Sequence, residues 1–200
     1  KTKKEFHAKC CLWYEKQNFT ASVIIERIFH LIRSDKGGEA ALLIAEEGRD
    51  LVAQGHMELL TLIEGLDLSS LDTQIQVRVL QLRGEILVLL GRFTEAEEIF
   101  LSTQSLTDSS KATRIDAEVL SALADIALKQ GDADKALSMH HDALEKFIQF
   151  GDERGAARSY NNMGYLLRRK NDLSKALEAY GEVEAILKSS TDPDLVSTQL

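Results

Sequence analysis

The 200-residue sequence contains a single proline, only two cysteines and few aromatic residues, which make up 6% of the chain. With one proline, almost nothing interrupts helices, because proline removes a helical hydrogen bond and clashes with the preceding turn. Long stretches in which Val, Ile and Thr alternate with polar residues are absent, which argues against a sheet. The many Leu, Ala, Glu and Lys residues favour helix instead. The composition therefore predicts an all-α fold.

Neither a disulfide framework nor a membrane segment is expected. The two cysteines, Cys10 and Cys11, are adjacent and have no other partner, so we expect a reducing compartment, the cytoplasm. No apolar run approaches the roughly 18 residues that span a bilayer, and we find no signal peptide. Since the sequence starts at Lys1 without an initiator Met, we interpret it as part of a longer protein.

The formal net charge of −8 is distributed unevenly. Residues 1–36 carry eight basic and four acidic groups, a net charge of +4. Residues 37–110 carry four basic and thirteen acidic groups (−9), and residues 111–200 carry twelve basic and fifteen acidic groups (−3). The acidic middle argues against nucleic-acid binding, which needs a basic stripe. The basic N-terminal segment, residues 1–36, could contact an acidic partner or a neighbouring domain. The alternative is that this segment is only a solvated end of the chain. Its first four lysines are Lys1, Lys3, Lys4 and Lys9.

Small and bulky residues recur at a fixed interval in the later part of the chain. Four series keep this interval: Gly84, Ala124 and Gly164; Gly91, Gly131 and Asn171; Ala96, Ala136 and Ala176; and Phe100, His140 and Tyr180. The interval is about 40 residues, and a fixed period of this size is typical of a helical solenoid. Each solenoid repeat buries its apolar face against its neighbours, and the stack presents an extended curved surface. The period therefore indicates binding rather than catalysis.

Turn residues divide the repeats into helix pairs. We expect helices over about 74–90, 94–107, 110–130, 134–150, 152–170 and 173–189. The turns at Gly91, Gly131 and Asn171 have residues that tolerate a left-handed backbone. Thr94 with Glu97 forms a capping-box pattern. Asp192-Pro193 is typical of a helix start, so it predicts the beginning of a further unit.

Residues 1–70 are expected to form two helix pairs with a weaker repeat: one pair consists of helices over 3–17 and 20–34, and the other lies within 38–66. The predicted organisation is one region of degenerate pairs, 1–70, and one region of clear repeats, 71–200. The clear repeats are 72–109, 110–151 and 152–191, with a truncated unit at 192–200. Together these elements predict a right-handed α-solenoid of about five helix pairs.

The small residues of the repeats are expected where paired helices cross, because only small side chains let two helix backbones approach closely. The first helix of each pair has its small residue midway, at Gly84, Ala124 or Gly164. The second helix has an alanine one turn from its start. Larger residues should fill the groove around each crossing: Leu80, Leu87, Phe100, Leu120, Leu123, Leu137, Tyr160, Leu167, Leu173 and Tyr180.

No constellation of residues suggests an enzyme. The histidines show no metal-ligand spacing with cysteine, and no His-Glu-x-x-His or phosphate-binding loop occurs. We expect His140 to be packed in the core. One of Cys10 and Cys11 should be buried and the other partly exposed, and a nucleophilic role for either would need a nearby base and a lowered pKa. No catalytic residue, metal or cofactor is therefore predicted.

The clear repeats resemble tetratricopeptide repeats over about Asp72–Leu200. The family pattern includes a small residue midway along the first helix, a turn, and an alanine in the second helix. It is present as Leu80, Gly84, Leu87, Gly91, Ala96 and Phe100; as Leu120, Leu123, Ala124, Ala127, Gly131, Asp132, Ala136, His140 and Ala143; and as Tyr160, Met163, Gly164, Leu167, Asn171, Asp172, Ala176 and Tyr180. The period exceeds the family's usual length of about 34 residues, which lengthens the helices by under two turns.

Residues 1–70 resemble the segment after the winged helix in large signal-transduction ATPases, including the maltose-system type of transcription activator. The resemblance rests on Phe6-His7-Ala8-Lys9, Trp13-Tyr14-Glu15, Phe19 and Ile24-Ile25, followed by residues 40–44, 51–55, 59–60 and 66. It implies that this part of the protein is a helical sensor arm that captures an inducer or protein partner. The alternative is a free-standing adaptor that holds a peptide in a concave groove.

The tetratricopeptide resemblance implies that the first helix of each pair lines the groove. By position, the lining residues are Gln81, Glu85, Ser121, Asp125, Arg158, Asn161, Asn162, Tyr165 and Arg168. An amide such as Asn162 can pair with both groups of a peptide backbone, and arginines can bind carboxylates. The alternative is that Asn161 and Asn162 only solvate the helix, and that Arg168 and Arg169 complement its dipole.

Overall fold

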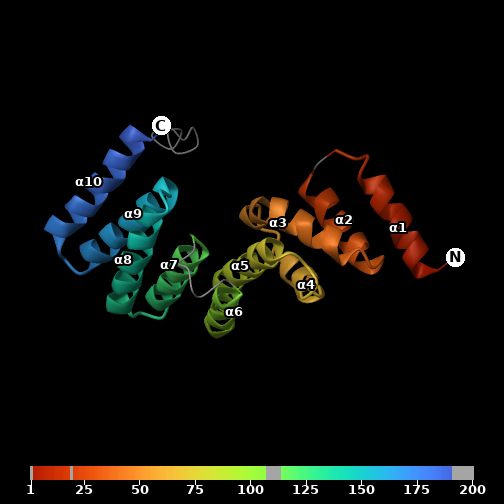
Figure 1. Cartoon of the computed structure of the whole chain (residues 1–200), viewed down its shortest axis with the longest axis horizontal. Helices are drawn as coiled ribbons and strands as arrows, with labels where there is room; N and C mark the ends of the chain where they lie inside the picture. Colours follow the sequence, from red (N-terminus) through yellow and green to blue (C-terminus); the bar gives the residue numbers. More distant parts are fainter. Residues whose placement is uncertain (1, 19, 107–113, 191–200) are drawn as a thin grey trace. The chain divides into compact units, whose positions relative to one another are not determined.

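The computed structural model describes residues 2–18, 20–106 and 114–190, and these residues form ten helices and no strand (Figure 1). The helices are α1 (Lys3–Tyr14), α2 (Ala21–Arg33), α3 (Gly37–Ala53), α4 (Leu59–Glu64), α5 (Thr73–Leu89), α6 (Phe93–Ser105), α7 (Arg114–Lys129), α8 (Ala133–Gln149), α9 (Glu153–Arg169) and α10 (Leu173–Ser189). The predicted all-α class is confirmed. The predicted start at Ser110 and the Asp192-Pro193 signal lie outside the described residues.

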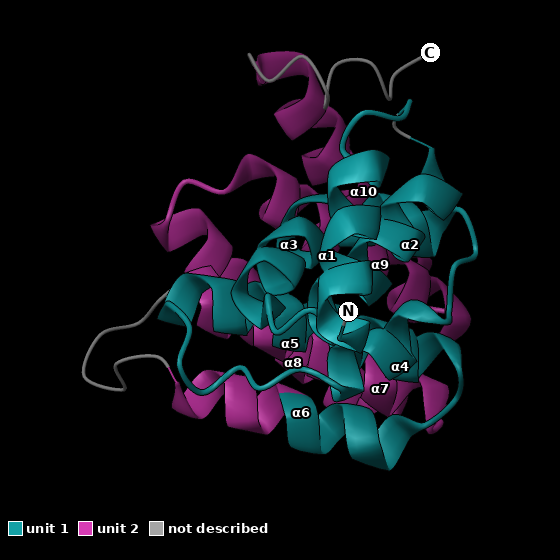
Figure 2. Ribbon diagram, turned by 90° about the vertical axis from the view of Figure 1, so that its right-hand side faces the viewer, with its two compact units in different colours: residues 1–99 teal, residues 100–200 magenta. Residues whose placement is uncertain are grey.

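The chain divides into two compact units, residues 1–99 and residues 100–200 (Figure 2). The division falls inside α6, so neither unit coincides with a predicted region. The predicted boundary near residue 70 was based on the regularity of the repeat rather than on packing, and it stays a prediction.

In the first unit, α2 and α3 link the N-terminal helix to the rest. Helix α1 packs on α2, α2 on α3, and α3 on α5, while the short α4 contacts α2, α3 and α5. A Cβ atom at Gly48 of α3 would overlap the side chain of Leu82 of α5. The absence of a side chain at Gly48 therefore allows these two helices to approach. Fully buried residues of this core include Ile28, Ile44, Leu51 and Leu59.

The second unit is built from consecutive antiparallel pairings of α7 with α8, α8 with α9, and α9 with α10. The predicted crossing residues Ala124, Ala136 and Ala176 are 3% exposed or less, which confirms their place in the core. At Gly164 a Cβ atom would lie 2.7 Å from the ring of Tyr180, so α9 and α10 meet where a glycine was predicted to permit it. His140 is fully buried, as predicted.

The left-handed turns are confirmed, with φ of +74° at Gly91, +92° at Gly131 and +64° at Asn171. Two of these turns lead into an aspartate that caps the next helix, since Asp132 and Asp172 accept hydrogen bonds from the backbone N–H three residues later. The predicted capping box at Thr94 is wrong. Helix α6 begins at Phe93, so Thr94 already lies in its first turn, and Arg92 occupies the position of the two aspartates.

One predicted core residue is wrong: Leu173 is 57% exposed. Its equivalent in the previous repeat, Ala133, packs against a cluster that includes Leu166 of the following helix α9. Leu173 begins α10, and the described residues contain no helix after α10. Burial of this position therefore depends on a following helix rather than on the crossing within its own pair.

Candidate partner-binding face on helices α7 and α9

The structure divides the predicted groove residues between buried and accessible positions. Gln81 of α5 and Ser121 of α7 are only 5% and 1% exposed, so the expectation that they line an open surface is corrected. Both side chains lie within packed helix faces. Glu85 of α5 is accessible but already paired, because its Oε1 lies 3.0 Å from the Arg49 guanidinium of α3. The remaining candidates all belong to the second unit.

A polar cluster joins α7, α8 and α9 at Asp125. Asn162 Nδ2 of α9 donates a hydrogen bond to Asp125 Oδ1 at 3.2 Å. His140 Nε2 of α8 lies 3.3 Å from the same oxygen. The imidazole of His140 is fully buried, whereas the Asp125 carboxylate is 47% exposed. Two predicted site residues, Asp125 and Asn162, are thus brought together from positions 37 residues apart in sequence.

The exposed side of α9 is basic and aromatic. Tyr165 is 39% exposed, and the guanidinium carbons of Arg168 and Arg169 each lie 5.8 Å from the centre of its ring. Arg158 lies 5.9 Å from the ring of Phe147. These are cation–π distances, which hold a guanidinium in place while leaving its N–H donors free. Within the described part of the chain, none of the three arginines has an ion-pair partner.

Arg169 was not among the predicted site residues. Its spacing from Tyr165, four positions along a helix, was a signal available in the sequence, because residues four apart share a helix face. The sequence interpretation assigned Arg169 only to the helix dipole. Asn161 is exposed and makes no contact that would fix its role.

The other candidate chemical groups are the two cysteines and the potential metal ligands. Cys11 is buried and Cys10 is partly exposed, as predicted. Burial raises the pKa of the Cys11 thiol, which keeps it protonated and a poor nucleophile. Within the residues that the structure describes, no three His, Cys, Asp or Glu side chains lie where they could hold a metal ion. None of the described helices is long and apolar enough to cross a membrane.

The comparisons with known proteins agree with this geometry. A tetratricopeptide repeat family model matches residues 116–189, which include nearly all of α7 and the whole of α8, α9 and α10. The region that holds Asp125, Arg158, Asn162 and Tyr165 is therefore similar to tetratricopeptide repeats. The comparison with curated proteins finds no match.

Two solved structures share the fold over 98% of this chain. BtubC (BKLC) from P. vanneervenii has a TM-score of 0.56 and 18% identity, and 78% of that chain is covered. PlcR from Bacillus thuringiensis, determined in complex with the peptide PapR7 and DNA, has a TM-score of 0.62 and 11% identity, and 68% of that chain is covered. At these identities the likeness concerns the fold alone. The resemblance of residues 1–70 to signal-transduction ATPases is not confirmed by these comparisons.

Proposed function

We propose that this chain is a non-catalytic binding module that captures a peptide segment of a protein partner. The binding surface would be the α7–α9 face, defined by Asp125, Arg158, Asn161, Asn162, Tyr165, Arg168 and Arg169. The observation that carries the proposal is the Asn162–Asp125 hydrogen bond, which joins α7 to α9 beside arginines that have no ion-pair partner among the described residues.

The Asn162–Asp125 pair is suited to binding a peptide backbone. An amide side chain has two N–H donors and one carbonyl acceptor, and only one donor is used in the bond to Asp125. That bond fixes the amide, so less conformational entropy is lost when its other groups pair with a backbone N–H and C=O. The buried His140 Nε2 lies 3.3 Å from the same carboxylate oxygen without a hydrogen bond that satisfies it.

The α9 arginines and Tyr165 would provide the side-chain contacts. Guanidinium groups bind carboxylates through paired, charge-assisted hydrogen bonds. Tyr165 offers an exposed aromatic surface that its two neighbouring arginines border. The face therefore favours a peptide that has at least one acidic residue next to an apolar one.

The biological setting is proposed at two levels. The similarity in fold to PlcR, a protein solved with a bound peptide and DNA, supports a role in a peptide-responsive regulator. The resemblance of residues 1–70 supports the narrower proposal of a sensor arm in a multidomain regulatory ATPase, and a free-standing adaptor is the alternative. A phosphate-binding loop encoded upstream of this segment would support the ATPase, and its absence would refute it. Both versions place the chain in the cytoplasm, in keeping with its two free cysteines.

Selection from a random-peptide phage library on the immobilised chain tests the binding face. We expect the selected peptides, resynthesised and titrated by calorimetry, to bind Asn162→Ala and Arg158→Ala about tenfold more weakly, which corresponds to about 1.4 kcal/mol. Gln149→Ala and Arg78→Ala change matched exposed residues elsewhere and should leave affinity unchanged. Equal affinity for all four variants, with unchanged helix content, would reject the α7–α9 face as the binding site.

A further inference from the structure

Helix α1 has large apolar side chains on the side that faces away from its neighbour. Its inner side packs on α2, where Cys11 is buried and Tyr14 stacks on His30. On the outer side Leu12 and Trp13 are 59% and 57% exposed, and Phe6, whose ring centre lies 6.4 Å from that of His30, is 62% exposed at the edge of this side. Neighbouring large apolar side chains at such exposures are typical of an interaction surface. The outer side of α1 therefore has the composition of an interface without a partner in this structure.

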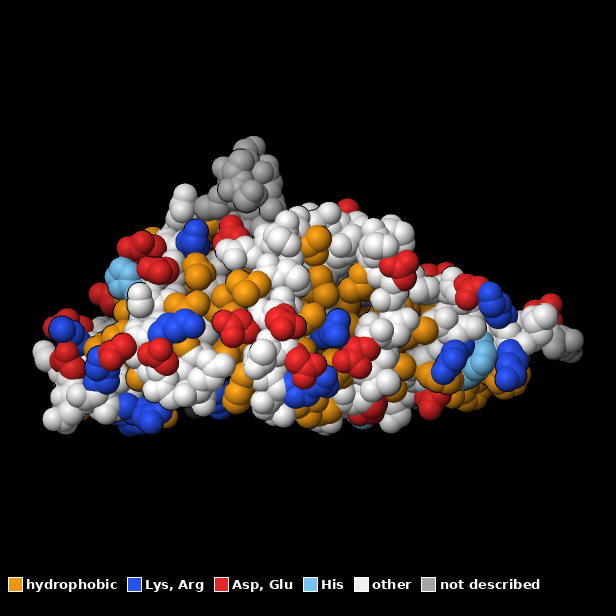
Figure 3. All heavy atoms as spheres, turned by 90° about the horizontal axis from the view of Figure 1, so that it is seen from below, with side chains coloured by type: hydrophobic (Ala, Val, Ile, Leu, Met, Phe, Trp, Pro, Cys, Tyr) orange, Lys and Arg blue, Asp and Glu red, His pale blue; other side chains and the backbone are white. Residues whose placement is uncertain are grey.

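Lysines without a partner border these apolar side chains. Lys3, Lys9 and Lys16 are exposed and have no ion pair within the described residues, whereas Lys4 is paired with Asp35. Glu5 is already engaged in a capping box with Thr2. Towards the right-hand end of the molecule in Figure 3, Lys and Arg side chains lie beside hydrophobic ones.

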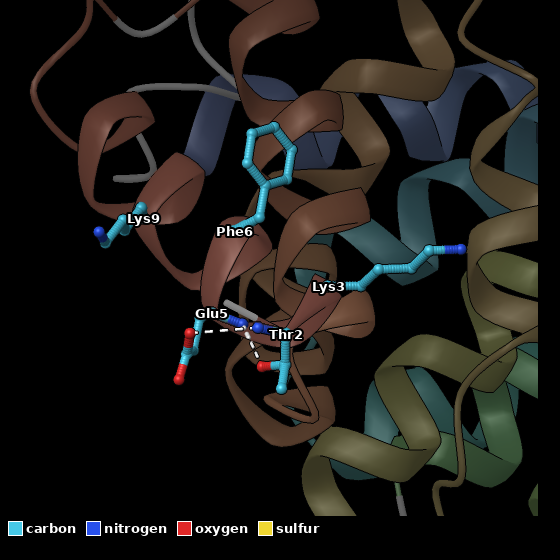
Figure 4. A pocket seen from close by; sticks show the side chains of 5 residues that line it. All are labelled: Thr2, Lys3, Glu5, Phe6 and Lys9. Carbon is cyan, nitrogen blue, oxygen red and sulfur yellow. Dashed lines mark hydrogen bonds between the residues drawn. The ribbon is translucent and has the colours of Figure 1, made fainter.

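A pocket marks the start of this surface. Thr2, Lys3, Glu5, Phe6 and Lys9 line a hollow of about 400 Å³. Figure 4 shows the Phe6 ring rising from the helix, with Lys3 and Lys9 projecting to opposite sides. An apolar group seated against Phe6 would thus have a positive charge on either side.

We propose that the outer face of α1, defined by Phe6, Lys9, Leu12 and Trp13 and bordered by Lys3 at the start of the helix and Lys16 just beyond its end, docks an acidic protein segment that contains leucine-like side chains. The apolar side chains would cover Phe6, Leu12 and Trp13, and carboxylates would pair with the three lysines. Helix α1 has 12 residues and is about 18 Å long, so its outer face matches a partner helix of similar length. This surface belongs to the first unit and is independent of the α7–α9 face.

Charge complementarity favours an acidic protein over an anionic membrane. The chain as a whole has a net charge of −8, and of the segments 1–36, 37–110 and 111–200 only the first is net positive. A negatively charged bilayer would attract α1 but repel the remainder of the chain. A short acidic segment can reach α1 alone, within about a Debye length of its lysines.

Trp13 is the only tryptophan of the chain, so its fluorescence reports directly on this face. The probe is a synthetic amphipathic helix, matched in length to α1, with leucines on one side and glutamates on its flanks; a matched peptide has lysine in place of every glutamate. We expect the acidic peptide to shift Trp13 emission to shorter wavelength with saturation, and the shift to weaken at high salt. The basic peptide should give no shift.

Variants locate the contact. Lys9→Glu and Phe6→Ser should each weaken binding of the acidic peptide about tenfold while helix content stays unchanged, because both side chains are exposed. Lys135→Glu, an equal change of charge at an exposed position of α8, is the control and should bind as the unmodified chain does. No shift with the acidic peptide, an equal shift with the basic one, or unaltered binding by Lys9→Glu would overturn the proposal. A shift caused by phosphatidylserine vesicles alone, or by protein concentration alone, would also overturn it, because the occupant would then be a lipid surface or a second copy.

Discussion

Replacement of Gly155 by alanine should destabilise the second unit, although alanine is the better helix former. Gly155 lies in the first turn of α9, against the ring of Phe147 from α8. A Cβ atom at this position would lie 2.6 Å from Phe147 Cγ. Phe147 is fully buried in a cluster with Ala117, Ala143, Leu144 and Ala156, so its ring has little room to move away.

The magnitude follows from two opposing effects. Carbon atoms pack best at about 3.5–4.0 Å, so the ring or the helix has to move by about 1 Å. Overpacking of this kind costs about 1–3 kcal/mol. The gain in helix propensity from Gly to Ala is at most about 1 kcal/mol and smaller in a first turn. We therefore expect a net loss of about 1–2 kcal/mol in the free energy of unfolding.

Gly181→Ala is the matched control. Gly181 lies inside α10, is exposed, and a Cβ atom added there would have no neighbouring atom within 4 Å. The same chemical change should there stabilise the chain by up to about 1 kcal/mol. The two glycine-to-alanine substitutions are thus expected to have opposite signs.

Urea unfolding followed by circular dichroism measures both effects, and a thermal melt should show shifts of about 2–4 °C per kcal/mol. Phe147→Leu provides a further check, since a smaller side chain makes room for the new methyl group. The double variant Gly155→Ala/Phe147→Leu should be more stable than the sum of the single effects by at least about 0.5 kcal/mol. Equal stability of Gly155→Ala and the unmodified chain would refute the described contact between α8 and α9.

Three further predictions concern a helix cap, a buried histidine and a helix crossing. Asp152 Oδ1 accepts from Gly155 N at 2.9 Å and Arg114 Nε lies 2.9 Å from Asp152 Oδ2, so Asp152→Ala should cost about 1–2 kcal/mol in urea unfolding. Asp152→Asn should lower the free energy of unfolding clearly less than Asp152→Ala, because asparagine can still cap the helix. Equal losses in the two variants would assign the effect to the ion pair with Arg114. Burial, and then the neighbouring His7, lower the pKa of His30 below its ordinary 6.5, so the unfolded chain binds more protons than the folded one. The contribution of neutral His30 to stability is thus complete above about pH 6.5 and is lost as the pH falls below that value, levelling off below the folded-state pKa. A urea midpoint, followed by Trp13 fluorescence, that is constant from pH 7.5 to 5 would contradict this. Ala136→Leu, at a fully buried crossing, should lower the free energy of unfolding by about 1–3 kcal/mol. Ala185→Leu, at an exposed site of α10, is the control and should leave stability nearly unchanged. Thermal melts with similar midpoints for the two variants would contradict the helix crossing at Ala136.

Residues whose role depends on local backbone geometry were predictable. A left-handed turn needs glycine or asparagine, and Gly91, Gly131 and Asn171 have that conformation. A close helix crossing needs a small residue, and Ala124, Ala136 and Gly164 are found there. These requirements leave a regular period in the sequence, which is why the helix pairs could be located with errors of only a few residues.

The candidate site was predictable only in part. The pairing of Asp125 with Asn162 joins two helices, and the register of the repeats suggested that both residues line one surface without indicating their contact. Arg169 was missed because its role depends on the exposed ring of Tyr165. The burial of Gln81 and Ser121 was missed because polar residue type normally indicates exposure.

The order of residues alone established the helices, their turns and the small residues at their crossings, because each of these depends on the backbone within one repeat. Packing between helices decided the rest. It buried two polar side chains that had been expected at the surface, left Leu173 exposed, and placed Nδ1 of His7 2.6 Å from Nδ1 of His30. It also left Phe6, Leu12 and Trp13 uncovered on α1. Such outcomes depend on which neighbour a helix face meets, and a local pattern contains no information about that neighbour.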